Sequence, residues 1–411
     1  MRGLGADEGA ATRRRCLATL ILAATLFVVA VAYVPGVMSP SVAGRWAAIT
    51  AVGLTIVLTR LPSASLEAPA ARVAALTLGW LAVSTTWSAS PLDTIGVTLH
   101  WAALAGLMML AHESEDLLPA WRALAVGVTV SLPFELAQLI GYEPVLSVSR
   151  VAVTGNVGLF MLSNVAAEVS AATAVLMLCH RQWLLAVGPL LCAALTGRNE
   201  VLLMLGAAGL STMWSSRGST TRAAAILAVV VMTAAAAVNV YASRVPVEFL
   251  AQRGALTMSF RVVVWLATVG QLSVLGGGAG TYALFFPEAI FAHNELLHYA
   301  FELGVGVIPL TWMVAHAMRS SPSPERHALA ALVGSALVWA PLQDPSTAAV
   351  FAVLAGYLCG ARRRARAAES AGRALDVDRA ERPLAVAATA LRQADRDDER
   401  MAVRSQHPHR G

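Results

Sequence analysis

Runs of apolar residues, separated by short polar segments, make up most of the chain. The runs are mostly 17 to 22 residues long, about the length that a helix rising 1.5 Å per residue needs to cross roughly 30 Å of hydrocarbon. They lack the alternation of apolar and polar residues that is typical of membrane-spanning strands. The pattern predicts an all-α integral membrane protein with about twelve transmembrane helices, at 16–34, 43–59, 71–88, 93–111, 119–140, 158–179, 182–197, 201–214, 223–241, 299–317, 327–341 and 344–360.

The composition supports a membrane protein and argues against nucleic acid as a partner. The sequence is 57% hydrophobic and 13% charged, far more apolar than an ordinary soluble domain. Its net charge of +5 comes without lysine, and the arginines cluster at the ends of the apolar runs, which is a signal of membrane topology. The four cysteines have neither a disulfide pattern nor the spacing of metal ligands. We therefore expect no metal and no cofactor.

The arginines of the short loops set the orientation. By the positive-inside rule, the loops that carry most of them are cytoplasmic. These arginines are Arg13 to Arg15, Arg60, Arg72, Arg122, Arg181, Arg217, Arg222, Arg319, Arg326 and the cluster from Arg362 to Arg366. We thus expect a cytoplasmic N-terminus (1–15), a polytopic domain in the plasma (inner) membrane (16–360) whose first span is retained, and a disordered cytoplasmic tail (361–411). The exceptions, on the outer side, are Arg45, Arg150, Arg198, Arg244, Arg253 and Arg261.

The longest connection, 242–298, lies on the outer face in this topology. Long loops between rigid elements often carry function. The apolar run that starts at 259–265 is too short to span the bilayer, so we expect a helix at the membrane interface. The glycine-rich stretch that follows, with Gly278 and Gly280, allows the backbone to approach a ligand closely. It lacks the Gly-Lys-Ser/Thr ending of a nucleotide-binding loop.

The stretch after these glycines contains His293-Asn294-Glu295-Leu296-Leu297-His298 at the mouth of an apolar helix, 294–317. Its two histidines are five residues apart, hence about 140° apart around a helix, and they do not fit a zinc protease motif. His293 shares the outer side with Arg198 and Arg261. Two arginines can hold a diphosphate without a metal, and a histidine with a pKa near 6.5 can take a proton from a hydroxyl.

Other polar residues lie in or beside the apolar runs. Glu302 lies four residues after His298 and is expected to pair with it on the helix. Polar groups inside a bilayer are candidates for function, although hydrogen bonds between helices also explain them. The remaining ones are His100, Glu135, Asn156, Asn164 and Glu168.

Several of these pieces together resemble the O-antigen ligase and polymerase superfamily. The resemblance covers about residues 150–320, and the residues that carry it are Gly155-Asn156, Asn164-Val165-Ala166, Thr196-Gly197-Arg198, Arg261 to Trp265, Gly276 to Thr281, His293 to Leu297 and Glu302 to Gly306. It implies a membrane glycosyltransferase of GT-C architecture with an extracytoplasmic loop. Such an enzyme is independent of metal, inverts the anomeric centre and moves a glycan from undecaprenyl diphosphate on the outer face of the membrane.

The resemblance also implies roles for individual residues. Arg198 and Arg261 would bind the diphosphate, and His293 would activate the acceptor hydroxyl. Further contacts to the substrate are expected from Asn164, Gly278, Gly280, Asn294 and Glu302. The chain departs from the family at Gly197-Arg198-Asn199, where Ser-Arg-Gly/Ala is common, and at Leu162-Ser163-Asn164, where Asn-Pro-Asn is common. The outer loop is also short for a ligase, and these departures leave the acceptor open.

Three acceptors and one different class of function remain open. The acceptor is a lipid or a glycan, as for a ligase or a polymerase, or else a protein. A transporter or flippase of lipid-linked glycans has a similar number of helices. It should show internal repeats and charges near the middle of the bilayer, whereas the strongest charges here lie at the outer edge. Membrane lipids are expected partners in every case.

Overall fold

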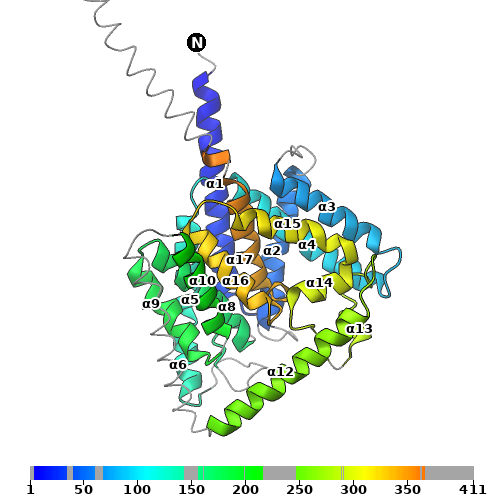
Figure 1. The fold of residues 1–411 in the computed structure, drawn as a ribbon. Helices are drawn as coiled ribbons and strands as arrows, with labels where there is room; N and C mark the ends of the chain where they lie inside the picture. The colour runs from blue at the N-terminus through cyan, green and yellow to red at the C-terminus, as the bar shows by residue number, and fades with distance from the viewer. Residues whose placement is uncertain are drawn as a thin grey trace, which may run out of the picture. The chain divides into compact units, whose positions relative to one another are not determined.

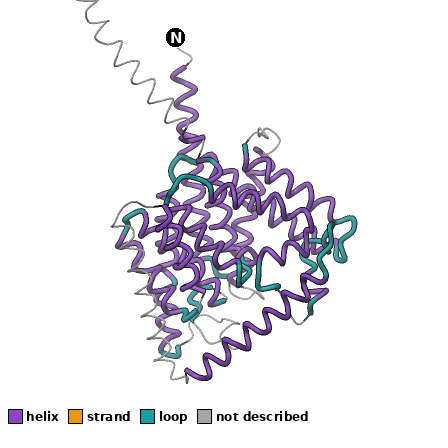
Figure 2. Tube along the Cα trace, viewed as in Figure 1, coloured by secondary structure: helices purple, strands orange, loops and turns teal. Residues whose placement is uncertain are grey.

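The computed structural model describes residues 4–34, 40–60, 68–142, 156–160, 162–198, 200–215, 247–287, 289, 291–361 and 363–365. Within these residues the regular elements are helices and no strand occurs (Figures 1 and 2), which confirms the all-helical fold there. The chain divides into two compact units, Met1–Gly360 and Ala361–Gly411. The predicted span 223–241 and nearly all of the tail lie outside the described residues.

The helices follow the apolar runs of the sequence. In chain order they are α1 (Leu4–Val31), α2 (Pro40–Arg60), α3 (Pro69–Ser84), α4 (Pro91–Glu113), α5 (Leu118–Val130), α6 (Leu132–Leu139), α8 (Ser163–Cys179), α9 (Trp183–Leu195), α10 (Glu200–Ser215), α12 (Val247–Gly270), α13 (Tyr282–Phe285), α14 (Glu295–Leu303), α15 (Val307–Met318), α16 (Pro324–Ala336) and α17 (Pro345–Cys359). Short 3-10 turns, η2 (Gly304–Gly306) and η3 (Pro341–Gln343), precede α15 and α17.

Four helical stretches in the described residues are long and apolar enough to cross a membrane: Ser41–Arg60, Pro91–Glu113, Leu118–Leu139 and Glu295–Met318. Seven further apolar helices have 10 to 17 residues. Large apolar side chains also face outward, among them Leu58 and Leu184, which are 75% and 90% exposed. Exposed apolar surface of this kind supports a membrane protein. The four long stretches coincide with four of the twelve predicted spans.

Two predicted elements differ from the structure. The expected short helix at 259–265 is part of a longer helix, α12, which has 24 residues. This helix already begins at Val247, in a more polar segment that the apolar pattern does not include. The expected continuous helix 294–317 is broken at Gly304–Gly306, where Gly304 has a left-handed φ of 55°. A Cβ at Gly304 would lie 2.1 Å from the Val274 carbonyl oxygen, so the break is fixed by the packed glycine loop. Figure 1 shows α14 and α15 meeting at an angle, with α12 crossing near α14.

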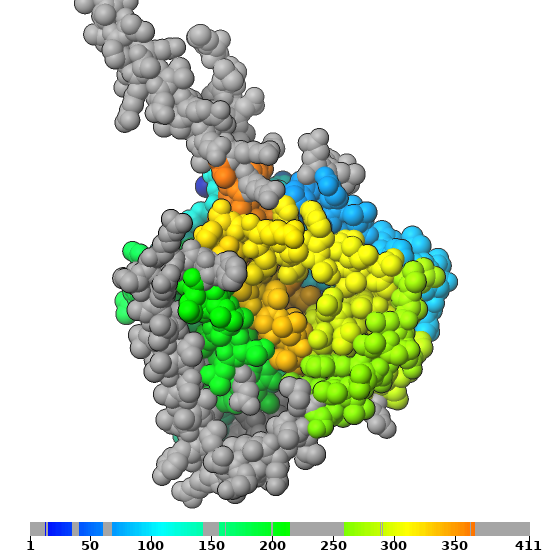
Figure 3. Space-filling model, in the orientation of Figure 1, coloured from blue at the N-terminus to red at the C-terminus, as the bar shows by residue number. Residues whose placement is uncertain are grey.

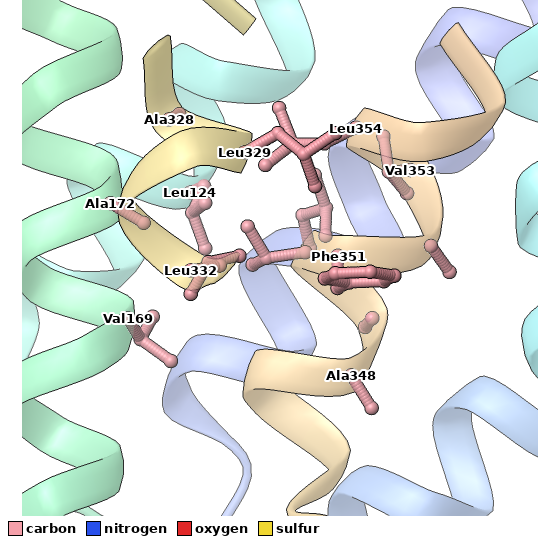
Figure 4. Packing of buried hydrophobic residues seen from close by; sticks show 14 of the residues in the cluster. Leu124, Val169, Ala172, Ala328, Leu329, Leu332, Ala348, Phe351, Val353 and Leu354 are labelled. Atoms are coloured by element: carbon pink, nitrogen blue, oxygen red, sulfur yellow. The ribbon is translucent and has the colours of Figure 1, made fainter. Parts of the chain in front are cut away.

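The core of the membrane unit lies where α5, α8, α16 and α17 meet. Figure 4 shows apolar side chains from these four helices packed together, including Leu124, Val169, Leu332 and Phe351. Small residues bring other helices into backbone contact. A Cβ at Gly53 of α2 would lie 2.0 Å from the Ala103 carbonyl oxygen of α4. Close approach at small residues is a common way for membrane helices to associate.

Arg45, one of the outer-side exceptions to the positive-inside rule, is completely buried in the protein. Its Nη1 donates to Ser346 Oγ at 3.0 Å, and its Nη2 donates to the carbonyl oxygens of Ala30 (3.2 Å) and Leu159 (3.1 Å). The guanidinium also lies 4.3 Å from the centroid of the Phe160 ring. This arginine therefore ties α1, α2, α17 and the segment before α8 together, a structural role that explains a charge in this position.

Candidate functional site

A polar corner forms where the start of α8, the turn between α9 and α10, α12 and the loop before α14 come together. Three contacts define it. Arg198 of the turn donates from Nε to Ser163 Oγ at the start of α8 (2.6 Å). Arg261 of α12 pairs with Glu200 at the start of α10. Trp265 of α12 donates from its indole nitrogen to the carbonyl oxygen of Ala292 (2.8 Å). We call this region the outer corner, after the side on which the sequence predicts it.

The ion pair of Arg261 and Glu200 is largely shielded from solvent. Nη2 of Arg261 lies 3.5 Å from Oε1 of Glu200, and the two side chains are 13% and 11% exposed. Within the part of the chain that the structure describes, the Arg261 Nε is buried without a hydrogen-bond partner. A guanidinium has five donors in a fixed fork. The long contact to Glu200 thus leaves Arg261 with donor capacity for an anionic ligand.

His293 lies in the loop directly before α14. Its backbone is left-handed, with φ of 52°, which is uncommon for a residue other than glycine. The imidazole contacts two aromatic rings, with centroid distances of 5.0 Å to Trp339 and 6.3 Å to Phe260. Its Nδ1 is buried and has no hydrogen-bond partner among the residues that the structure describes. Strained backbone of this kind is found at functional sites, where the surrounding structure holds it.

Burial and the nearby Arg261 lower the pKa of His293 to about 4, while the Glu200 carboxylate acts in the opposite direction. Desolvation disfavours the charged imidazolium, and a neighbouring cation repels it. The ring is therefore neutral at physiological pH. A neutral imidazole with a free ring nitrogen can accept a proton, so this geometry is compatible with a general base.

Asn294 fixes the position of this histidine. Its side-chain oxygen accepts from the Leu297 backbone N–H (3.0 Å) and so caps α14. Its Nδ2 donates to the Leu337 carbonyl oxygen at the end of α16 (3.1 Å). Asn294, which the sequence predicts to contact substrate, thus uses its side chain for two hydrogen bonds within the protein. These bonds hold the loop that carries His293 between α14 and α16.

Asn164 lies in the first turn of α8, next to the Ser163 that accepts from Arg198. It is 6% exposed, and its Oδ1 has no hydrogen-bond partner in the described ranges of the chain. Gly197, with φ of 64°, allows the tight turn that carries Arg198. The structure therefore brings Arg198 and Asn164 to adjoining positions at the outer corner.

Gly278, Gly280 and Glu302 lie in a second cluster, packed between α14 and the start of α4. The Gly278 N–H donates to the Glu302 carbonyl oxygen (2.9 Å), and a Cβ at Gly278 would lie 2.3 Å from Ser88 Oγ. Glu302 is 2% exposed, lies 3.4 Å from His298 Nε2 and accepts from the Tyr282 N–H (3.1 Å). The sequence predicts that the backbone of these glycines approaches a ligand closely, but it packs against other parts of the protein. Glu302 pairs with His298, as their spacing of four residues predicts.

Sequence reasoning missed three residues around the outer corner. Glu200 was not assigned a role, although an acidic residue at the start of an apolar run is a known signal of function. Trp339 contacts His293 from a distant part of the chain, for which the sequence gives no signal. Glu295, which follows Asn294, is 5% exposed, and neither of its carboxyl oxygens makes a hydrogen bond of good geometry within the described residues.

Comparison with known proteins adds no assignment. No protein-family model matches the chain, and no curated protein matches it at a significant level.

Proposed function

We propose that the protein is a membrane glycosyltransferase, similar to O-antigen ligases, that moves a glycan from an undecaprenyl-diphosphate carrier to an acceptor outside the plasma membrane. The observation that carries this proposal is the neutral His293 beside Arg261, each with a buried nitrogen that has no partner among the described residues. Buried donors without acceptors are costly. A ligand with an anionic group and a hydroxyl would satisfy both residues.

In the proposed reaction, Arg261 and Arg198 bind the diphosphate. Guanidinium groups fork onto phosphate oxygens and stay charged at any physiological pH. They stabilise the negative charge that develops on the leaving diphosphate, without the need for a metal. Glu200 keeps Arg261 in place before the donor binds, and the donor oxygens compete for the same guanidinium.

His293 acts as the base on the acceptor. The acceptor hydroxyl gives its proton to the imidazole, its oxygen forms a bond to the anomeric carbon, and the bond between that carbon and the diphosphate oxygen breaks. Attack opposite to the leaving group inverts the anomeric centre. The bound diphosphate places negative charge near His293, which raises its pKa. Donor binding thus converts a weakly basic imidazole into a better proton acceptor.

The test is release of undecaprenyl diphosphate from a labelled lipid-linked glycan by purified protein in liposomes containing a chelator. We expect release by the native protein and none by His293→Ala. His316→Ala is the matched control, because His316 lies in the last turn of α15, at the far end of the stretch that starts at Glu295. Arg261→Lys should release little, because lysine lacks the fork.

Two outcomes would overturn this proposal. Full release by His293→Ala would remove the proposed base, and loss of release on adding chelator would remove the metal-independent mechanism. Movement of the glycan across the bilayer without release would instead identify a transporter. A ladder of product lengths, as opposed to a single attachment, would identify a polymerase.

A further inference from the structure

A cavity of about 290 Å³ lies between α4, α14, α15, α16 and α17. Figure 3 shows a hollow on this face of the molecule, between the yellow and orange helices. Its wall is almost entirely apolar and includes Trp101, Leu310, Val333, Leu337 and Phe351. The volume is at the lower end of the range for ligand pockets, roughly 300 to 1,000 Å³. The cavity has the size and the lining for an apolar chain.

Glu295 is the acidic residue in this wall. It is 5% exposed, and neither carboxyl oxygen makes a hydrogen bond of good geometry within the described residues. The Tyr299 hydroxyl, which accepts from Gln343 Nε2 at 3.1 Å, and the Leu342 backbone lie close enough to interact with this carboxyl group. A buried carboxyl group without a well-placed donor costs free energy. Such a group in an apolar wall indicates the place where the polar end of a ligand binds.

The position of Glu295 relates the cavity to the proposed reaction. It starts α14 and follows His293 by two residues, so the two Cα atoms are at most about 7 Å apart. The cavity extends from this end to Met313 and Phe351, in the middle parts of α15 and α17. A chain that fills it therefore presents its polar head next to the loop that carries His293.

We propose that this cavity binds the acceptor, and that the acceptor is a lipid alcohol. Its apolar chain fills the cavity, and its hydroxyl donates a hydrogen bond to Glu295. The inference rests on the proposed function, which requires a hydroxyl next to His293. A phosphate head is disfavoured because it would meet a carboxyl group, and the arginines proposed to hold the donor are not in the wall. Donor and acceptor thus have separate sites.

The first experiment measures binding alone. Purified protein in nanodiscs is exposed to three dodecyl probes that carry a diazirine in the chain and differ only in the head: an alcohol, its methyl ether and an amine. Labelled residues are identified by mass spectrometry. We expect the alcohol to label the cavity about tenfold more than the ether, as one hydrogen bond to such a group would give.

Two variants and a control make this result specific. Glu295→Leu should reduce the labelling by the alcohol to that of the ether, and Leu310→Trp should block the chain and reduce both. The control is Glu113→Gln, which changes a carboxyl group at the last residue of α4, whereas the glycine loop packs against the first turn of this helix. This variant should be labelled as strongly as the native protein. Thermal unfolding of each variant separates loss of binding from loss of fold. Equal labelling by alcohol and ether, or stronger labelling by the amine, would overturn the proposal.

The second experiment separates this inference from the proposed function. Labelled donor and dodecanol are incubated with the native protein, and the glycosyl alcohol is measured. Transfer to another acceptor, without labelling of the cavity by the alcohol, would overturn the inference alone. Labelling without release of undecaprenyl diphosphate under any condition would overturn the proposed function, and with it the role of the cavity as acceptor site.

Discussion

Arg261 and Glu200 form an ion pair across the outer corner, with Nη2 3.5 Å from Oε1. The two residues belong to different helices, and they act on His293 in opposite directions. The arginine disfavours the charged imidazolium and the glutamate favours it. The charge state of the histidine is therefore set by this pair together with the burial of the ring.

The first prediction concerns the protonation of His293. In the protein without ligand, the imidazole of His293 should be half protonated near pH 4, and this titration midpoint is well below the usual value of about 6.5 for histidine. Arg261→Gln should raise the midpoint because it removes a repelling cation, and Glu200→Gln should lower it further. The midpoint can be measured from the pH dependence of carbethoxylation of the peptide that contains His293. A midpoint near 6.5 in the native protein would contradict the assignment.

The same shift has a consequence for stability. Between about pH 4 and 6.5 the unfolded chain binds a proton at His293 and the folded protein does not, so the free energy of unfolding should rise with pH across this window. It should fall as the pH drops from 6.5 towards 4. His293→Gln should flatten this part of the profile, measured by denaturation in detergent at a series of pH values. An unchanged profile would show that other groups control it.

The second prediction concerns the ion pair itself. Glu200→Gln should lower the free energy of unfolding by about 1 to 3 kcal/mol, the cost of leaving a buried polar group without its partner, because the shielded Arg261 loses its counter-charge. The control is Glu115→Gln at the pair of Arg15 and Glu115, whose side chains are 48% and 60% exposed. An exposed pair contributes only about 0 to 1 kcal/mol. Equal losses for both variants would contradict a special role for Glu200.

The helices could be predicted from the sequence because the signal is local. A long run of apolar residues predicts a helix independently of the rest of the chain. The four long apolar stretches of the structure accordingly coincide with predicted spans. The break at Gly304–Gly306 has a signal too, since two glycines flank Val305, but the apolar residues on both sides of it predict a single helix. The length of α12 was missed because its first turns are more polar than a membrane helix.

The contacts of the site could not be predicted in the same way. Shared topology placed Arg198, Arg261 and His293 on one side of the membrane, but it gave no distances within that side. The partners Glu200 and Trp339 come from α10 and from the segment after α16, and only the packed fold brings them to Arg261 and His293. The glycine loop was assigned to a ligand, whereas its close contacts are with the protein.

The third prediction tests the close contact between α2 and α4. A Cβ at Gly53 would lie 2.0 Å from the Ala103 carbonyl oxygen, whereas a Cβ at Gly79 of α3 would meet nothing within 4 Å. Gly53→Ala should therefore separate the two helices and lower the unfolding temperature. Gly79→Ala should be neutral or stabilising by up to about 1 kcal/mol, because alanine favours a helix over glycine. If both variants behave alike, the two helices do not depend on this contact.

The last prediction concerns Arg45. Arg45→Met should lower the free energy of unfolding by about 3 to 5 kcal/mol, as loss of one partner in a buried charged network does. It leaves the Ser346 hydroxyl and two backbone carbonyls without their donor and removes the positive charge near Asp344. Arg45→Lys should recover only part of the loss, because an ammonium group cannot reach three partners in a fork. Arg122→Met, at an exposed arginine of α5, should change stability by no more than about 0.5 kcal/mol. Equal stability of Arg45→Lys and the native protein would mean that charge alone, and not the geometry of the guanidinium, holds α1, α17 and the segment before α8 together.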